Sequence, residues 1–300
     1  MNKTFGPDPN RKPLKIGEAL FDWYVRTYVM GIVNVTPDSF YDGGRYTEPQ
    51  TAVEHGLMLI NEGADILDIG GESTRPKGPY GEGAQTLPAQ EELRRVIPVI
   101  EGIRKRSRVP ISIDTYKSEV AATALDAGAD MINDVSGLQM DPRMPEVAAR
   151  HAAPVVINHM KGTPQNMQQN PEYGDLIGEI TGFFRDKFRI LAEAGVPRER
   201  IIVDPGLGFG KSFQHNLEVI HRLKEFQSLG CPVLVGPSRK SFVGHYAGDL
   251  PPVERLEGTI AAAVLCTLNG ANILRVHDVK ACVRAIRLTE AYMRQGVKGD

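Results

Sequence analysis

The chain has 300 residues, of which 7% are aromatic, with 31 glycines and 21 prolines, a composition that suits an α/β protein with many short turns. Its formal net charge of −2 gives no electrostatic reason to expect nucleic acid or an anionic membrane as a partner. No apolar run approaches about 20 residues, and the start of the chain lacks the apolar stretch of a signal peptide, so we expect no membrane-spanning segment.

Cysteine usage bears on the compartment. The three cysteines, Cys231, Cys266 and Cys282, are odd in number and form no Cys-x-x-Cys pair. A disulfide framework is therefore not expected, because such frameworks need paired cysteines in an oxidising compartment. We predict a soluble cytoplasmic protein.

A repeated string precedes several short apolar segments. Gly-Ala-Asp or Gly-Ala-Asn stands at 63–65, 128–130 and 270–272, with a looser copy at 195–197, and each copy leads into an apolar run. Glycine can end a helix in the left-handed conformation, and the β-branched run that follows is typical of a buried strand. Proline is tolerated at the first residue of a strand, and it opens three further runs. Eight strands are thus predicted, at 28–33, 66–69, 110–113, 131–134, 154–157, 201–204, 232–235 and 273–276.

Segments with helical periodicity lie between the predicted strands. Apolar residues recur at helical spacing in 53–64 and 93–103, and 261–268 is predicted to be a buried helix. Eight strands that alternate with helices predict a (β/α)8 TIM barrel, while a doubly wound open sheet is the competing fold. We expect one barrel domain over 28–296 and an N-terminal extension, 1–27, that packs on the barrel floor.

Every predicted strand ends in polar residues, and in a barrel these ends meet at one rim, where the active site lies. One group consists of short acceptors and amide donors that suit the edge of a flat heterocycle, although each alone could equally be a satisfied core group or, for Asp114, a helix cap. Its members are Asp114, Asn133 and Asp204. A second group consists of neutral donors and cations that suit an anion, most naturally phosphate. Its members are Asn34, Arg75, Lys240, Arg275 and His277.

Two loops at the same rim carry weaker signals. The glycine-rich segment 206–211 lacks the upstream spacing of a P-loop, so close approach of its backbone to a ligand is the better interpretation. The segment 238–241, Ser-Arg-Lys-Ser, could bind a carboxylate through hydroxyls and backbone amides. No Ser-His-Asp order and no zinc-ligand spacing compete for the chemistry.

Several of these strings resemble motifs of the dihydropteroate synthase family of folate biosynthesis, the target of sulfonamides, over residues 28–292. The motifs are NVTPDSF at 34–40, GGESTRP at 70–76, NDVSG at 133–137, DPGLGF at 204–209, SRKS at 238–241 and RVHD at 275–278. The stretch at 77–83 is longer than we expect for that family. The resemblance implies an enzyme that joins p-aminobenzoate to 6-hydroxymethyl-7,8-dihydropterin diphosphate, giving 7,8-dihydropteroate and pyrophosphate.

The resemblance also implies a role for each matching position. The pterin would be held by Asp114, Asn133, Met160, Asp204, Phe209 and Lys240. The diphosphate would be held by Asn34, Thr74, Arg75, Arg275 and His277, with Asn34 also a ligand of Mg²⁺. The p-aminobenzoate would be framed by Phe40, Pro76 and Ser241. The catalytic groups would be Asp42, Lys240, Arg275 and His277, in a chain that forms a homodimer through its late helices.

Pyrophosphate is a good leaving group once its charge is neutralised, so we expect an S_N1-like, Mg²⁺-assisted transfer without a covalent adduct to the protein. The long loops 35–48 and 71–88 are the predicted lids. One alternative is a pterin-binding methyltransferase that acts on methyltetrahydrofolate, which gives no reason for the segments 238–241 and 275–277. Another is a non-catalytic pterin-binding homologue, against which stand the filled catalytic positions.

Overall fold

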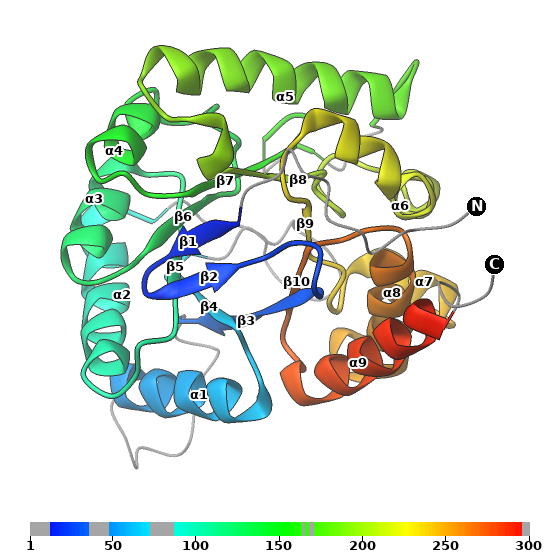
Figure 1. Ribbon diagram of the computed structural model, residues 1–300, viewed down its shortest axis with the longest axis horizontal. Coiled ribbons are helices and arrows are strands. Elements are labelled where there is room, and N and C mark those ends of the chain that lie inside the picture. Colours follow the sequence, from blue (N-terminus) through cyan, green and yellow to red (C-terminus); the bar gives the residue numbers. More distant parts are fainter. Residues whose placement is uncertain (1–12, 36–47, 73–86, 164–165, 168–170, 296–300) are drawn as a thin grey trace.

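Eight parallel strands form the sheet at the centre of the molecule in the computed structural model (Figure 1). The structure describes residues 13–35, 48–72, 87–163, 166–167 and 171–295. The strands of this sheet are β3 (Tyr28–Asn34), β4 (Ile66–Gly70), β5 (Ile111–Asp114), β6 (Met131–Asp134), β7 (Val155–Asn158), β8 (Ile201–Asp204), β9 (Leu234–Val235) and β10 (Ile273–Val276). All eight predicted strands are therefore present, with ends within about two residues of the prediction.

The sheet closes into a barrel. Its hydrogen-bonded order runs from β8 through β7, β6, β5, β4, β3 and β10 to β9. The two outer members then meet, because Val203 pairs with Val233 and the Val203 amide donates to the Pro232 carbonyl at 3.0 Å. This closure confirms the (β/α)8 TIM barrel and rules out the doubly wound open sheet.

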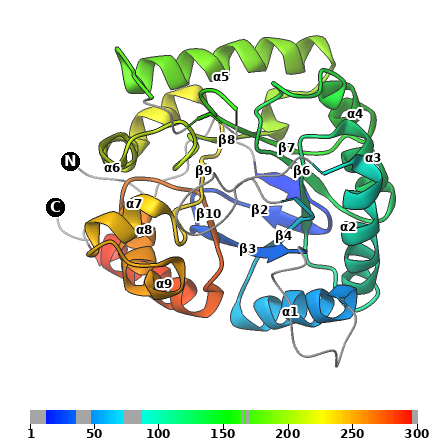
Figure 2. The same ribbon diagram turned by 180° about the vertical axis from the view of Figure 1, so that it is seen from behind.

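Helices surround the barrel and follow its strands (Figures 1 and 2). They are α1 (Glu48–Glu62), α2 (Ala89–Arg104), α3 (Ser118–Asp126), α4 (Met144–Arg150), α5 (Leu176–Glu193), α6 (Phe213–His221), α7 (Ser241–Tyr246), α8 (Leu256–Leu268) and α9 (Val279–Gln295). Short 3₁₀ helices lie at Arg198–Arg200, Leu223–Leu229 and Pro252–Glu254. Two α-helices, α7 and α8, follow β9, where the sequence pattern predicted one.

The glycines of the repeated string have the predicted backbone conformation. Gly63, Gly128, Gly195 and Gly270 all adopt positive φ, between 90° and 111°. Each lies where a helix ends and the chain turns toward the next strand. Residues with a Cβ atom rarely adopt this backbone conformation. The glycine-led repeat is therefore the helix-to-strand turn of the barrel.

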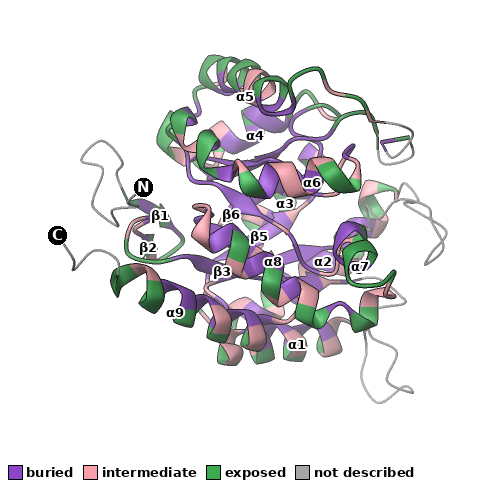
Figure 3. Cartoon of the chain, turned by 90° about the vertical axis from the view of Figure 1, so that its right-hand side faces the viewer, coloured by how far each residue is buried: buried purple, intermediate pink, exposed green. Residues whose placement is uncertain are grey.

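Segment 261–268 is helical, as predicted, but the prediction that it is buried is wrong for one face. Ala263 and Cys266 on α8 are fully buried, whereas Leu265 is 46% exposed. Figure 3 shows the same division on α8 and α9, with buried positions toward the barrel and exposed positions away from it. The helix is apolar on both faces, so hydrophobicity alone could not tell the two faces apart.

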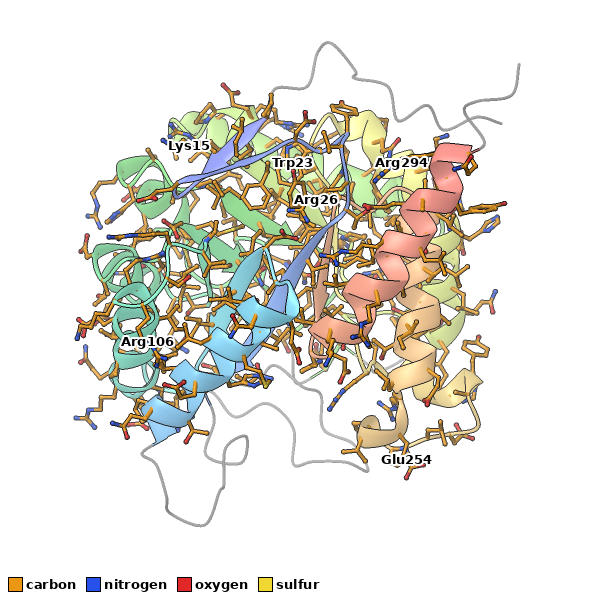
Figure 4. All side chains as sticks on the ribbon, turned by 60° about the horizontal axis from the view of Figure 1, so that its bottom comes forward. Lys15, Trp23, Arg26, Arg106, Glu254 and Arg294 are labelled. Atoms are coloured by element: carbon orange, nitrogen blue, oxygen red, sulfur yellow. The ribbon has the colours of Figure 1, made fainter. Side chains whose placement is uncertain are left out.

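Residues 14–23 lie across the amino-terminal end of the barrel. Strands β1 (Leu14–Ile16) and β2 (Ala19–Phe21) pair antiparallel as a hairpin, which Figure 1 shows in front of the barrel. Phe21 and Trp23 stack at 5.5 Å between ring centroids, and Figure 4 places Trp23 on this segment. They belong to a buried cluster that also contains Tyr28 and inward side chains of seven barrel strands, namely Met30, Ile66, Met131, Val156, Ile202, Leu234 and Ile273. No helix among the described residues is long and apolar enough to cross a membrane.

Candidate active site

A polar layer lies inside the barrel above the apolar floor. Side chains alternate along a strand, so residues two positions apart share a face. Two residues beyond the floor residues Ile66, Met131, Ile202 and Ile273 come polar side chains at the carboxyl ends of the same strands. They are Asp68, Asn133, Asp204 and Arg275, and Asp114 takes the corresponding place on β5.

Arg275 bridges two carboxylates in this layer. Its Nε donates to Asp68 Oδ2 at 2.5 Å, and its Nη2 donates to Asp114 Oδ2 at 2.6 Å. The Asn133 amide donates to the same Asp68 oxygen at 3.0 Å. Burial opposes the guanidinium charge, but the carboxylates of Asp68 and Asp114 outweigh it and raise the pKa of Arg275. The predicted site residues Asp114, Asn133 and Arg275 therefore form one connected group.

Asp114 has an unusual protonation equilibrium. Burial raises the pKa of its carboxyl to about 7; the nearby charge of Arg275 works against this rise, and the negative charge of Asp68 adds to it. A carboxyl with a pKa near 7 gains or loses its proton in the physiological range. Shifted pKa values of this kind are common at active sites.

Asp204 stands at the end of β8 on the same rim. Its Oδ1 accepts a hydrogen bond from the Gly206 amide at 2.7 Å, and its backbone carbonyl accepts one from the His159 amide at 2.8 Å. Burial raises the pKa of the Asp204 carboxyl to about 6, while the charges of Lys240 and Lys211 act in the opposite direction. Asp204 is thus a buried acceptor that nearby lysines help to keep ionised.

Lys240 and Phe209 meet across the loops that follow β8 and β9. The Lys240 ammonium lies 4.3 Å from the centroid of the Phe209 ring, within the range of a cation–π contact. A Cβ atom on Gly208 would lie 3.2 Å from Lys240 Cδ, so this glycine leaves room for the lysine stem. The structure therefore brings together Asp204, Phe209 and Lys240, as the sequence predicts.

His277 lies two residues beyond Arg275, directly after the end of β10, and its position is fixed by Ser238. The Ser238 hydroxyl accepts from the His277 amide at 3.2 Å and lies 3.0 Å from His277 Nδ1. Burial and the nearby cations Arg275 and Arg239 lower the pKa of His277 to about 3. At physiological pH the ring is therefore neutral, so one of its nitrogens carries a proton and can donate while the other can accept.

Arg239 and Asp278 do not belong to the charged centre of the rim. Arg239 donates to both carboxylate oxygens of Asp278, at 3.0 and 2.7 Å. Arg239 has a positive φ of 55°, and its carbonyl accepts from Arg255 at 2.9 Å. This pair fixes the loop that presents Ser238 and Lys240.

The other described site residues lie around this centre. Met160 is buried after β7, Asn34 is half-buried at the end of β3, and Ser241 is exposed as the first residue of α7. Five predicted residues lie outside the described part of the chain. These are Phe40, Asp42, Thr74, Arg75 and Pro76.

The glycines of 206–211 serve the packing of the loop. A Cβ atom on Gly206 would lie 2.0 Å from the His159 carbonyl oxygen, and one on Gly210 would lie 2.4 Å from the Lys161 carbonyl oxygen. Both glycines also adopt positive φ. These glycines therefore allow close approach to the loop after β7, and the predicted approach to a ligand stays a prediction.

Sequence reasoning did not assign Asp68 and Lys211 to the site. Asp68 is fully buried, and its Oδ1 has no hydrogen-bond partner within the described structure. Lys211 is 1% exposed and lies 2.9 Å from His159 Nδ1. A charged residue within an otherwise apolar strand was the available signal for Asp68, whereas Lys211 reads from sequence as an ordinary loop lysine.

The rim can bind a ligand with two chemically different parts. Asp114, Asn133 and Asp204 supply acceptors and an amide in a nearly buried setting, as the edge of a nitrogen heterocycle requires. Arg275 and His277 supply a permanent cation and a neutral donor, which suit an anion. The residues present no group of three or more His, Cys, Asp or Glu side chains with metal-binding geometry in the described ranges.

Known proteins are similar to this chain in sequence and in fold. The profile of the family described as pterin binding enzyme matches residues 30–277. Dihydropteroate synthase from Synechocystis sp. is 47% identical over 282 residues, which cover 94% of this chain and 96% of that protein. The structure of Xanthomonas albilineans dihydropteroate synthase with 4-aminobenzoic acid has a TM-score of 0.86 and 44% identity, covering 93% of this chain and 97% of that one. The same enzyme in complex with 7,8-dihydropteroate has a TM-score of 0.83 and 41% identity, covering 94% and 98%.

Proposed function

Because the chain belongs to the pterin-binding enzyme family and, within it, to the dihydropteroate synthases, we propose that it joins p-aminobenzoate to 6-hydroxymethyl-7,8-dihydropterin diphosphate, forming 7,8-dihydropteroate and pyrophosphate. The observation that carries the proposal is the polar layer above the barrel floor. It places carboxylates for the heterocycle beside a cation for the diphosphate.

The pterin subsite consists of Asp114, Asn133 and Asp204, with Lys240 and Phe209 beside it. Ring N–H and amino groups of a dihydropterin are donors, so ionised carboxyls are the partners they need. Lys240 and Phe209 contribute a positive charge and an aromatic ring next to Asp204. Met160 contributes apolar surface to the same pocket, which suits a flat ring.

The diphosphate subsite consists of Arg275, His277 and Asn34. Arg275 is held in place by Asp68, which keeps the guanidinium at the rim before a ligand arrives. His277 is neutral at physiological pH, and its ring carries one N–H donor. Preorganised donors of this kind stabilise the charge that develops on a leaving pyrophosphate.

Mg²⁺ fits the diphosphate subsite if the substrate diphosphate and water supply most of its ligands. The half-buried amide of Asn34 offers one hard oxygen donor at the end of β3. Mg²⁺ accepts such an arrangement, because it commonly keeps several waters and takes its remaining ligands from substrate phosphates. Bound there, the ion would supply positive charge to the leaving group.

The chain's own residues then support a dissociative transfer. Arg275 neutralises part of the charge of the leaving pyrophosphate and His277 donates a hydrogen bond to it, so the carbon–oxygen bond can break before the amine attacks. Asp204 and Asp114, when ionised, stabilise positive charge spread over the dihydropterin ring. Ser241 is exposed as the first residue of α7, directly after Lys240. In this proposal its hydroxyl binds the carboxylate of p-aminobenzoate. The amine of p-aminobenzoate completes the reaction at the methylene carbon and loses its proton.

A pyrophosphate-release assay with both substrates and Mg²⁺ tests the proposal. We expect pyrophosphate and 7,8-dihydropteroate to form in equal amounts and only when both substrates are present. The absence of pyrophosphate above the no-enzyme rate would overturn the proposal. Methyl transfer from methyltetrahydrofolate to a corrinoid protein would instead favour the methyltransferase alternative.

Lys240→Ala is expected to weaken pterin diphosphate binding and to lower kcat/KM by about a hundredfold, since it removes a cation that faces Asp204 and the Phe209 ring. The half-exposed side chain makes the fold tolerant of the change, so the melting temperature should stay near that of the wild type. Titration calorimetry and steady-state kinetics check this. Unchanged kinetics would remove Lys240 from the site. Lys224→Ala, at an exposed lysine outside the barrel, is the matched control.

We further propose that the chain is a cytoplasmic homodimer assembled through α8 and α9. Leu265, Leu288 and Tyr292 on these helices are 46%, 73% and 73% exposed, and the two helices pack side by side. Large exposed apolar side chains that are grouped on neighbouring helices are typical of a subunit interface. The three cysteines are free and buried, which suits a reducing compartment.

Leu288→Asp and Tyr292→Asp together are expected to convert the dimer to a monomer, because they place charges in the apolar surface. Size-exclusion chromatography with light scattering measures the mass. Leu20→Asp, a change of the same kind on the hairpin, should leave the dimer intact. A wild-type chain that is monomeric at micromolar concentration would contradict the proposed assembly.

A further inference from the structure

Lys211 is a lysine that the fold removes from water. It ends the glycine-rich loop after β8, directly before Ser212, whose side chain caps α6. Only 1% of its surface is exposed. Lysine is almost never fully buried unless its ammonium has partners, because removal of the charge from water is costly. The partners of Lys211 therefore indicate what the residue does.

The Lys211 ammonium connects two segments of the rim. It lies 2.9 Å from His159 Nδ1 and donates to the Phe209 carbonyl at 3.2 Å. When Lys211 is protonated its ammonium has no lone pair, so Nδ1 is then the acceptor and the imidazole proton sits on Nε2. Burial, together with the charge of Lys211, lowers the pKa of His159 far below its usual range, which keeps this imidazole neutral.

Both partners of Lys211 contact the pterin subsite. The His159 amide donates to the Asp204 carbonyl at 2.8 Å, and the Gly206 amide donates to Asp204 Oδ1 at 2.7 Å. Phe209, whose carbonyl accepts from Lys211, carries Lys240 over its ring at 4.3 Å. One buried ammonium thus links the segment after β7 to the loop after β8 that presents Phe209.

Charge connects the same residues. Burial lowers the pKa of Lys211 to about 7, while the carboxylate of Asp204 opposes this fall and Lys240 reinforces it. In turn, burial raises the pKa of Asp204, and Lys240, Lys211 and Arg275 hold it down. Lys161 is the other cation that acts on His159. Lys211 is the fully buried cation of this set, so water screens its charge least.

We propose that Lys211 is a positioning residue of the pterin subsite, which fixes His159 and the Phe209 loop through hydrogen bonds and keeps Asp204 ionised through its charge. This inference rests on the proposed function, since it concerns the same pterin. Lys211 does not touch the ligand. Lys211 affects pterin binding indirectly, through Asp204 and Phe209. The effect depends on pH, because the positive charge of Lys211 has most influence in the pH range in which Asp204 would otherwise be protonated.

Lys211→Met tests the proposal in the full chain, with pterin diphosphate and Mg²⁺ as the probe. We expect the Kd to rise about tenfold at about pH 5.5, since loss of one nearby cation shifts a buried carboxyl by one unit or more. At about pH 8.5, where Asp204 is ionised in both proteins, the rise should be about threefold or less. Lys211→Gln removes the charge but keeps an N–H donor, so it should share the pH-dependent loss. Lys224→Met is the exposed control and should bind as the wild type does.

Two further readouts separate the possible failures. If the wild type binds no pterin diphosphate, the proposed function fails. If the wild type binds and Lys211→Met has the same Kd at both pH values, only the inference about Lys211 is overturned. A loss of equal size at both pH values would also overturn it, because a merely structural lysine predicts that result. Should Lys211→Met fail to fold, the imidazole ¹⁵N spectrum of the wild type decides: we expect an unprotonated Nδ1 on His159, and a proton there would refute the contact.

Discussion

Arg275→Met is expected to lower kcat by a factor of about a hundred to a thousand, and also to destabilise the fold by about 3 kcal/mol. The catalytic loss follows from the place of the guanidinium, which is the permanent cation of the proposed diphosphate subsite. The loss of stability has a different cause. Arg275 neutralises Asp68 and Asp114, and its removal leaves the fully buried Asp68 without its charged partner.

Arg275→Lys separates these two effects. A lysine keeps one positive charge, but it cannot span two carboxylates as the planar guanidinium does, at 2.5 Å to Asp68 and 2.6 Å to Asp114. We therefore expect most of the stability to return and only part of the turnover. Urea denaturation gives the free energy of unfolding, and pyrophosphate release gives kcat.

Arg104→Met is the matched control. Arg104 pairs with Asp130 at 2.6 Å and is as little exposed as Arg275, but Asp130 precedes β6 at the opposite end of the barrel. This variant should lose stability and keep its turnover. If Arg275→Met kept wild-type kcat, or if Arg104→Met lost it, the diphosphate subsite would have to be placed elsewhere.

The architecture could be predicted from sequence because its signals are local. Gly63, Gly128 and Gly270 end helices, and proline opens other strands, so the element order follows from conformational rules that act over a few residues. Burial of α8 could not be predicted in the same way. Ala263 and Leu265 are both apolar, and only the position of the helix relative to its neighbours makes one buried and the other exposed.

The site could be predicted to the level of strand ends but not to the level of contacts. Arg275 pairs with residues 207 and 161 positions earlier in the chain, and no local pattern encodes such a pairing. Sequence reasoning placed Asp114 and Arg275 in separate groups, one for a heterocycle and one for an anion. In the fold they form one ion pair, because the closed barrel brings β10 within reach of β5.

Lys211 shows a second kind of limit. Its neighbours in sequence are glycines and a serine, which predict an exposed loop. Burial arises only because positive φ at Gly206 and Gly210 folds the loop against the segment after β7. The role of a residue in such a loop depends on tertiary packing, so it becomes visible only with coordinates.

Asp204→Asn is expected to lower kcat/KM by about a thousandfold, because a site built to accept ligand N–H groups loses far more than one hydrogen bond when an acceptor is replaced. The amide can still accept from Gly206, so the loop should keep its conformation. The pH profile gives the sharper reading. Burial raises the pKa of Asp114 to about 7 and that of Asp204 to about 6, and both carboxyls must be ionised to bind the pterin.

Wild-type kcat/KM should therefore fall as pH decreases through about 7 and then about 6, with a limiting logarithmic slope of about two. In Asp204→Asn a single titrating carboxyl, Asp114, remains, so the slope should be about one. Asp134→Asn makes the same chemical change at the end of β6. There the carboxylate accepts hydrogen bonds from the Ser136 and Leu138 amides, and it is not part of the proposed pterin subsite. That control should keep a slope of two while it lowers the melting temperature. A slope of two in Asp204→Asn would mean that the second proton is taken up by another group, and Asp204 would lose its assigned place beside the pterin.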